Sequence, residues 1–153
     1  MTNEQYRLRW VARMLRKQKK GLKIIDVGAG ECQYKKYCSH LKYKSQDFNK
    51  YDPRKEKAGL QMPSWNNQSI DIVCDITKIP VKKSSFDIVL CTEVLEHLLC
   101  PEEAIKEISR ITKKGGKLIL TAPFCSLTHF APYHYSTGFN RYYYNEVFKK
   151  YDI

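Results

Sequence analysis

The sequence contains no long hydrophobic run. None of its apolar stretches approaches the roughly 18–20 residues that a transmembrane helix needs. The first twenty residues are basic and amphipathic, and they lack the apolar segment of a secretory signal peptide. We therefore expect a protein without a membrane span that stays in the cytoplasm.

The six cysteines include no C-x-x-C pair. Several of them fall within apolar segments, where a cysteine behaves as a small hydrophobic side chain. Their spacing is typical of buried thiols in a reducing compartment. No metal site is expected from this pattern.

Acidic residues are scarce, because 16 Asp and Glu stand against 27 Lys and Arg, and the net charge at pH 7 is +11. Such a field can attract nucleic acid or an anionic substrate, but a lysine-rich solvated surface has the same composition. No RNA-binding signature with stacking aromatic residues accompanies the charge. The charge alone therefore does not indicate an RNA enzyme.

The length of 153 residues suits one domain that spans the whole chain, 1–153. Short apolar strands that alternate with helices indicate a doubly wound α/β fold, with helices on both faces of a mostly parallel sheet. A polar loop is expected over residues 49–69. The expected helices cover about 4–19, 33–41, 93–99, 101–114 and 140–150, and the expected strands cover 23–27, 42–47, 70–74, 86–91 and 117–122.

The most informative segment runs from Ile24 to Cys32, where an apolar strand leads through Asp26 into Gly28-Ala29-Gly30. Such a turn at the end of a buried parallel strand presents backbone N–H groups and a helix N-terminus to a ligand. Glycine lets the ligand approach the main chain closely. The dinucleotide fingerprint needs a further glycine where this chain has Gln33, so the spacing argues against a hydride-transfer enzyme.

Polar residues also follow the later strands, and ligands of open parallel sheets bind beyond the carboxyl ends of their strands. Asp47 follows the second strand, where a carboxylate can accept hydrogen bonds from both ribose hydroxyls. Asp75 and Ile76 follow the third strand and suit the amino group and the face of an adenine. Thr92 follows the fourth. One Asp at a strand end is usually a turn or a helix cap, but the ordered set predicts a nucleoside-type cofactor.

These motifs resemble those of class I S-adenosylmethionine-dependent methyltransferases of the type-11 kind. The resemblance extends from about Lys23 to the C-terminus, and its most specific parts are IDVGAG at 25–30, FDIVL at 86–90, EVLEH at 93–97 and KGGKL at 114–118. It implies a Rossmann-like sheet of about five strands in the order 3-2-1-4-5. It also implies S-adenosylmethionine as the cofactor and S-adenosylhomocysteine as the product.

The resemblance assigns a role to each residue of the cofactor site. Asp26, Gly28, Ala29 and Gly30 would lie against the methionine portion, Asp47 would hold the ribose, Asp75 and Ile76 would take the adenine, and Thr92 would lie near the sulfonium. Cys32 stands where the family usually has a third glycine.

The histidines are the candidates for acceptor chemistry. The sulfonium is already a good leaving group, so the protein mainly holds the acceptor in line with the methyl group, and a general base is needed only if the acceptor loses a proton. His129 and His134 lie in the loop after strand five and are the candidate catalytic residues, although they could equally shape the acceptor site. His97 is expected to have a packing or capping role.

The resulting hypothesis is methyl transfer to a small-molecule or glycan acceptor, because residues 128–135 resemble loops that cover the acceptor in methyltransferases from glycan-modification clusters. Two alternatives remain open. One is an RNA or protein methyltransferase that uses the basic surface, and the other is an inactive cofactor-binding module.

The family fold has seven strands, and this sequence ends where the sixth should begin. The C-terminal hairpin is therefore expected to be absent, and strand five would be a sheet edge that carries Leu118, Ile119 and Leu120. Exposed apolar edges invite pairing. We expect either a fragment or a chain whose edge is covered by a homodimer or another partner.

Overall fold

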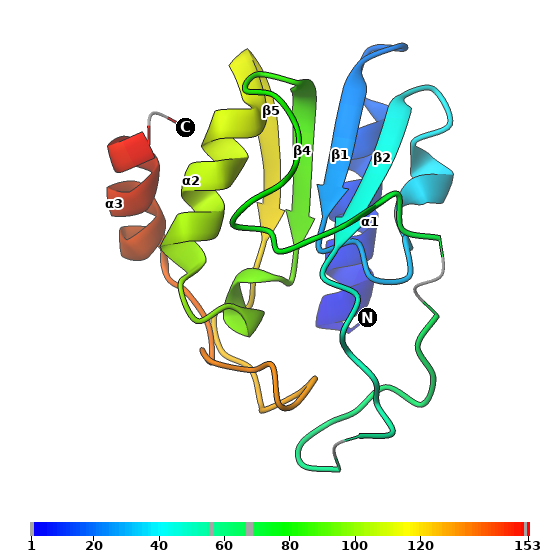
Figure 1. Cartoon of the computed structure of the whole chain (residues 1–153), viewed down its shortest axis with the longest axis vertical. Coiled ribbons are helices and arrows are strands. Elements are labelled where there is room, and N and C mark those ends of the chain that lie inside the picture. Colours follow the sequence, from blue (N-terminus) through cyan, green and yellow to red (C-terminus); the bar gives the residue numbers. More distant parts are fainter. Residues whose placement is uncertain (1, 56, 67–68, 152) are drawn as a thin grey trace.

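A computed structural model of the chain describes residues 2–55, 57–66, 69–151 and 153. Five parallel strands form one sheet in the order β3-β2-β1-β4-β5, which confirms the predicted fold class and strand order. The strands are β1 (Lys23–Val27), β2 (Lys42–Asp47), β3 (Ile72–Val73), β4 (Phe86–Thr92) and β5 (Thr112–Thr121). Because every pairing is parallel, their carboxyl ends all point to the same edge of the sheet, as Figure 1 shows for β1, β2, β4 and β5.

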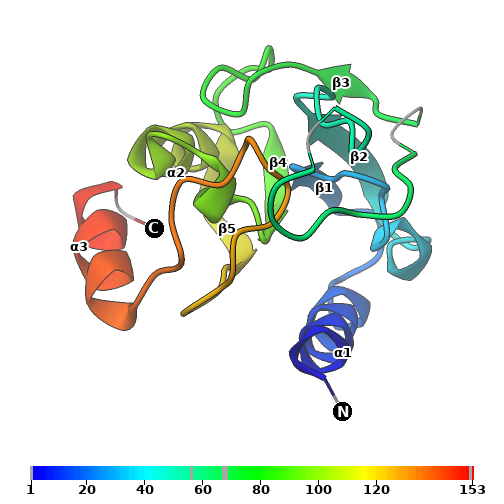
Figure 2. The same ribbon diagram turned by 90° about the horizontal axis from the view of Figure 1, so that it is seen from below.

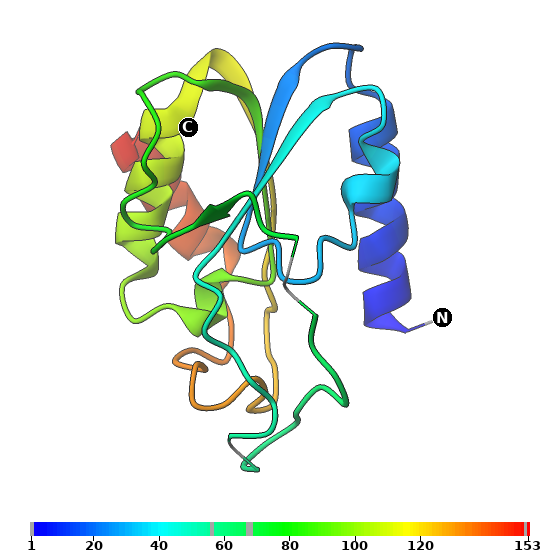
Figure 3. The same ribbon diagram turned by 45° about the vertical axis from the view of Figure 1, so that its right-hand side comes forward.

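Helices cover both faces of the sheet (Figure 3). One face carries α1 (Asn3–Arg16) and the 3₁₀ turn η1 (Lys35–Tyr37), and the other carries η2 (Leu95–His97), α2 (Pro101–Ile111) and α3 (Arg141–Tyr151). Each face has its own apolar cluster. Val11 and Leu15 of α1 pack on Ile24 and Leu90, whereas residues of α2 and α3 pack on Ile25, Val27 and Val89 of the opposite face.

Local sequence explains the two helices that frame the sheet. Thr2 caps α1 in a reciprocal pair with Gln5, whose backbone N–H it accepts at 3.2 Å. Pro101 begins α2, and acidic residues occupy its first turn, where they favour the helix dipole. Neither helix is long and apolar enough to cross a lipid bilayer, and the same holds for every helix within the described residues.

Two predicted helices are wrong. In place of a helix over 33–41, the chain forms only η1, and Cys32 just before this segment has a positive φ of 56°. The helix predicted over 93–99 is reduced to η2. There Glu93 has a φ of 53°, and Pro101 disfavours helical backbone at the residue before it.

The expected boundaries of α2, β3 and β5 also require correction. Helix α2 ends at Ile111 instead of 114, because Thr112 is extended and pairs with Phe86 of β4. The Gly-Gly pair lies inside β5 as a register irregularity and does not end the helix. Strand β3 shortens to two residues.

Strand β5 ends the sheet on one side, as predicted. Its apolar side chains are nevertheless covered, because Leu118 and Leu120 pack on the α2 side and Ile119 packs on the α1 side. The exposed feature of this edge is therefore backbone and not an apolar surface.

Candidate functional site

A cavity of about 510 Å³ lies beyond the carboxyl ends of β1, β2 and β4, within the range of about 300–1,000 Å³ that is usual for ligand sites. Residues of two long segments line it, and Figure 2 shows both segments from below. They are the β2–β3 loop, described over 48–55, 57–66 and 69–71, and the β5–α3 loop, residues 122–140. Residues predicted to bind the cofactor line it, namely Gly28, Ala29, Gly30, Asp47, Asp75, Ile76 and Thr92.

The glycine turn is held by the end of β2. The Gly28 N–H donates to Gln46 Oε1 at 3.3 Å, the Ala29 N–H donates to the Gln46 carbonyl at 2.9 Å, and the Gly30 N–H donates to Asp47 Oδ2 at 2.9 Å. These donors are therefore occupied, and an α-helix N-terminus does not follow. A phosphate-binding loop needs free backbone N–H groups and a helix N-terminus. Since this turn offers neither, the site favours a nucleoside-type ligand without a pyrophosphate.

Asp47 is a buried carboxylate in the wall of the cavity, with a relative exposure of 6%. Besides the Gly30 N–H, it accepts the Asn49 N–H through Oδ1 at 2.8 Å. Each carboxylate oxygen can accept a further hydrogen bond. The side chain is thus fixed by two backbone donors while it can still receive ribose hydroxyls.

Asp26 departs from the predicted set, because it does not line the cavity. Its side chain is buried, and its Oδ2 accepts a 2.8 Å hydrogen bond from the Tyr43 hydroxyl. Burial raises its pKa to about 7, partly offset by the Tyr43 bond. The Asp26 side chain therefore lies outside the cavity lining in this structure, and its predicted role in the cofactor site stays a prediction.

The raised pKa of Asp26 makes a prediction about stability. A carboxyl whose folded pKa, about 7, exceeds its unfolded value of 3.8 stabilises the fold fully below pH 4, and this contribution is lost as the pH rises to 7. In cofactor-free protein, Asp26→Asn should remove on the order of 3 kcal/mol of that pH dependence. Urea unfolding of both proteins between pH 4 and 8 measures it. If the free energy of unfolding changes with pH equally in the parent and in Asp26→Asn, the raised pKa of Asp26 is contradicted.

The two loops meet above the cavity. The Leu60 N–H donates to the Thr128 carbonyl at 2.9 Å, and the Phe130 N–H donates to the Leu60 carbonyl at 3.1 Å. Aromatic rings support this bridge, with ring centroids 4.5 Å apart for Tyr51 and Phe130 and 5.1 Å apart for Trp65 and Phe130. The loops therefore form a common roof, which we call the loop bridge.

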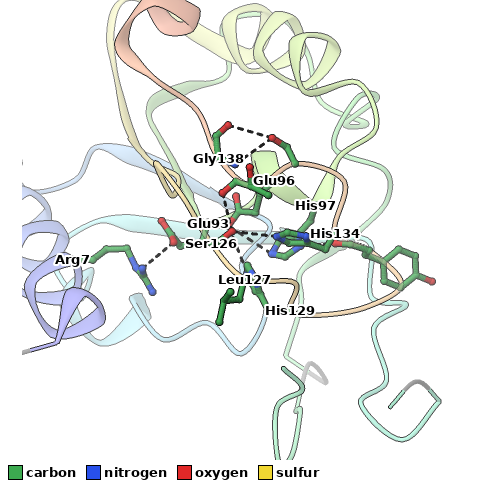
Figure 4. Close-up of polar contacts among 12 residues, drawn as sticks. Arg7, Glu93, Glu96, His97, Ser126, Leu127, His129, His134 and Gly138 are labelled. Atoms are coloured by element: carbon green, nitrogen blue, oxygen red, sulfur yellow. Dashed lines mark hydrogen bonds and ion pairs between the residues drawn. The ribbon is translucent and has the colours of Figure 1, made fainter. Parts of the chain in front are cut away.

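Three histidines lie close together (Figure 4), and two of them, His97 and His129, contact Phe130 of the loop bridge. The ring centroids are 4.8 Å apart for His97 and His129 and 4.7 Å apart for His129 and His134. Burial lowers the pKa of His97 to about 4, and burial also lowers the pKa of His134. His97 and His129 line the cavity, whereas His134 lies outside that lining and contacts both rings. The two candidate catalytic histidines are therefore close together and adjoin His97.

Several residues of this site were not predicted from the sequence. Arg7 of α1 extends into the cavity and forms a 2.9 Å ion pair with Glu93 (Figure 4). Gln46 connects the glycine turn to the end of β3, because its Nε2 donates to the Cys74 carbonyl at 2.7 Å. The helical periodicity of α1 in the sequence did not predict the Arg7–Glu93 ion pair. A glutamine at the end of a buried strand could have suggested the hydrogen bond from Gln46 to Cys74.

The strand order of the parallel sheet and the glycine turn secured by the second strand define the class I S-adenosylmethionine-dependent methyltransferase fold. Asp47, Asp75 and Ile76 line the cavity beside that turn. The model of one family, described as "Methyltransferase domain", matches residues 25–120. The chain belongs to this methyltransferase domain family, and S-adenosylmethionine is the cofactor of that family.

The similar proteins differ in the acceptors that their names specify. Mouse "Probable tRNA methyltransferase 9B" is 27% identical over 114 residues, which cover 72% of this chain and 24% of the mouse protein. Haemonchus contortus phosphoethanolamine N-methyltransferase 2, solved with S-adenosyl-L-methionine, has a TM-score of 0.66 at 20% identity, with 96% of this chain and 36% of that one covered. The present chain thus spans about a quarter of this curated relative.

A third similarity is to a chain in the complex between the Haloferax volcanii Trm112 methyltransferase activator and a methyltransferase. Its TM-score is 0.66 at 15% identity, and the alignment covers 95% of this chain and 67% of that one. At these identities the solved structures support the fold alone.

Proposed function

We propose that this chain binds S-adenosylmethionine in the cavity and transfers its methyl group to an acceptor that enters beneath the loop bridge. The observation that carries this proposal is a glycine turn whose backbone N–H groups are already hydrogen-bonded within the protein, beside a cavity lined by carboxylates. Gln46 and Asp47 take the turn's N–H groups, while Asp47, Asp75, Ile76 and Thr92 line the same cavity. This arrangement suits an amino-acid–nucleoside ligand better than a phosphate.

Each lining residue then has a defined task. Asp47 would accept the ribose hydroxyls, Asp75 would accept the adenine amino group, and the buried Ile76 would pack on the ring. Thr92 ends β4 on the side of Glu93 and the histidines, so the reactive methyl group would lie there. Methyl transfer needs alignment of acceptor and sulfonium, which in well-oriented systems contributes about 7–11 kcal/mol.

We favour a small-molecule or glycan acceptor, because residues of the β5–α3 loop cover the region beyond Thr92. His97, His129, Phe130 and Tyr133 line the cavity there, and the loop bridge roofs it. Such a compartment fits a compact acceptor or the end of a longer one. His129 and His134 would shape this compartment or take a proton from a hydroxyl acceptor.

An RNA acceptor is the second candidate, and two observations favour it. The net charge is +11, and the mouse relative at 27% identity is named a tRNA methyltransferase. Electrostatic RNA binding weakens steeply with salt.

The deciding experiment combines cofactor calorimetry with a transfer assay. S-adenosylmethionine and S-adenosylhomocysteine should both bind the folded chain, and labelled methyl groups should appear in a pool of small hydroxylated and glycan acceptors. If labelled methyl groups appear in total tRNA and not in that pool, and this transfer weakens with salt, the RNA alternative is favoured. Cofactor binding without transfer to either pool would favour the inactive module, whereas no cofactor binding by folded protein would refute the proposal for this chain.

A partner at the β5 edge remains part of this proposal. It rests on the backbone of β5, which ends the sheet among the described residues, and on the activator complex known for a protein with a similar fold. Pairing of this edge with a second copy or another chain would extend the sheet.

A further inference from the structure

Glu96 is the most unusual side chain in the molecule. It lies in η2, its exposure is 0%, and neither carboxylate oxygen has a hydrogen-bond partner among the described residues. Burial raises its pKa to about 8. A buried, unpaired carboxylate is costly, and buried polar groups without a partner are rare in folded proteins. This acid therefore requires an explanation.

Two imidazoles present a ring nitrogen to the same carboxylate (Figure 4). His97 Nε2 lies 3.7 Å from Glu96 Oε1, and His129 Nε2 lies 4.0 Å from the same oxygen. The three potential ligand atoms all lie within 4.8 Å of one another. These distances are too long for hydrogen bonds and leave a small space between the three groups.

The hydrogen bonds on the far side of each ring determine its tautomer. His97 Nδ1 contacts the Tyr133 carbonyl, and His129 Nδ1 contacts the Leu127 carbonyl at 2.8 Å. A carbonyl oxygen only accepts, so each Nδ1 donates its N–H. In a neutral imidazole with this tautomer, Nε2 carries the lone pair that a metal ion needs. Backbone carbonyls orient metal-binding histidines in the same way.

When Glu96 is ionised, all three groups that meet at this point are acceptors, with no donor among them. We propose that Glu96, His97 and His129 form a binding site for a divalent transition-metal ion. The ion would satisfy the buried carboxylate and both imidazole nitrogens together. This site departs from the expectation drawn from the cysteines, because its ligands are separated in the sequence and assemble only when the β5–α3 loop packs on η2.

The backbone supports this assembly independently of any ion. The Glu96 carbonyl accepts the Tyr135 N–H at 2.9 Å and the Ser136 N–H at 3.2 Å. These bonds fix the β5–α3 loop on η2 and keep His129 close to Glu96. The site is therefore largely formed before an ion arrives.

The ligand types indicate which ion would bind. Two histidines and one carboxylate suit Zn²⁺ or Fe²⁺, whereas Mg²⁺ and Ca²⁺ prefer oxygen ligands. Bonds of about 2.0–2.2 Å bring neighbouring ligand atoms to roughly 3.0–3.5 Å, so the side chains would close in by about an ångström. His129 lies on a loop and can make most of this movement.

The site adjoins the methyl-transfer region. His97 and His129 line the cavity beside Thr92 and Glu93, and Glu96 lies behind them. Three protein ligands leave coordination positions open, and here they would face the cavity. If the proposed methyl transfer holds, an oxygen-bearing acceptor would occupy one of these positions.

The test measures metal binding directly and does not depend on activity. Exposed thiols could also bind Zn²⁺, so the experiment uses a Cys100→Ser, Cys125→Ser background, in which the two exposed cysteines are removed. After treatment with chelator, Zn²⁺ is titrated by calorimetry and Co²⁺ by its visible absorption. We expect one equivalent of each ion to bind and the melting temperature to rise, while Mg²⁺ has a much smaller effect.

Three variants locate the ion. Glu96→Gln keeps the shape and its amide can donate to a neighbouring Nε2, so it should fold at least as stably without metal and yet lose roughly tenfold or more in Zn²⁺ affinity. His129→Ala should show a similar loss. His134→Ala is the matched control, because its ring lies on His129 but its Nε2 contacts Ser126 Oγ at 3.2 Å, and it should bind Zn²⁺ as the parent does.

Two results would overturn the metal site. One is the absence of Zn²⁺ and Co²⁺ binding by folded parent protein, which would leave Glu96 as a protonated structural acid. The other is unchanged affinity in both Glu96→Gln and His129→Ala. Cofactor calorimetry on the same samples is a separate readout, so a failed metal site and a failed methyltransferase proposal can be distinguished.

Discussion

Replacement of Asp47 by alanine is expected to weaken S-adenosylmethionine binding by about 10–100-fold. Hydrogen bonds to a charged group contribute about 1.5–3 kcal/mol, and this carboxylate would accept the ribose hydroxyls. The substitution also removes the acceptor of the Gly30 N–H at 2.9 Å, so the turn loses its anchor to β2. Isothermal titration calorimetry with the parent and the variant measures the difference.

Asp47→Asn separates the two roles of this side chain. Asparagine keeps an oxygen for the Gly30 N–H but loses the charge and one acceptor, so its affinity should fall between those of the parent and Asp47→Ala. Asp52→Asn is a control for the general effect of removing an acid, because Asp52 pairs with Arg54 outside the cavity lining. Equal affinities for Asp47→Ala and the parent would exclude Asp47 from the cofactor site.

Gly28→Ala is expected to destabilise the fold by about 2–5 kcal/mol and to abolish measurable cofactor binding. A Cβ at this position would lie 2.4 Å from Val94 Cγ2, and the residue has a φ of +67°. The left-handed conformation costs about 1–2 kcal/mol for a non-glycine residue, and overpacking typically adds 1–3 kcal/mol. Urea unfolding measures the stability, and calorimetry measures the binding.

Gly115 provides a matched control, because its φ is +72° and nothing lies within 4 Å of an added Cβ. Gly115→Ala should therefore show the conformational penalty alone and leave cofactor binding intact. A second substitution, Val94→Ala, should restore part of the stability of Gly28→Ala by making space. Equal losses for Gly28→Ala and Gly115→Ala would mean that the contact with Val94 has no role.

The sequence predicted most of the sheet, because its signals are local. Ile24, Ile25 and Val27 read as a buried strand and are fully buried, and the residues after each strand were correctly expected to converge. Asp47, Asp75 and Thr92 accordingly line one cavity. Parallel strands make this possible, since their carboxyl ends meet at the same edge whatever lies between them.

The errors arose where contacts distant in sequence decide the outcome. Residues 33–41 have tyrosines and lysines compatible with a helix, but only η1 forms there, and Tyr34 and Cys38 are buried in a cluster with residues of α1 and β1. The position of Asp26 near the end of β1 did not suggest that its carboxylate would accept the Tyr43 hydroxyl, 17 residues away, and its role in the cofactor site stays a prediction. The grouping of Glu96 with His129 depends on how a long loop folds back, and no periodicity in the sequence encodes that.

The loop bridge divides the molecule into parts that can change separately. The glycine turn is secured by β2 through three backbone donors, whereas the roof is joined by the two backbone hydrogen bonds at Leu60. The β2–β3 loop also contacts the turn, because Trp65 lies against Gly30 and the Asn66 N–H donates to Glu31 Oε1 at 2.8 Å. Insertions or substitutions in the β5–α3 loop would therefore remodel the roof with the least effect on the turn, and evolution or an engineer could exchange that half of the roof separately.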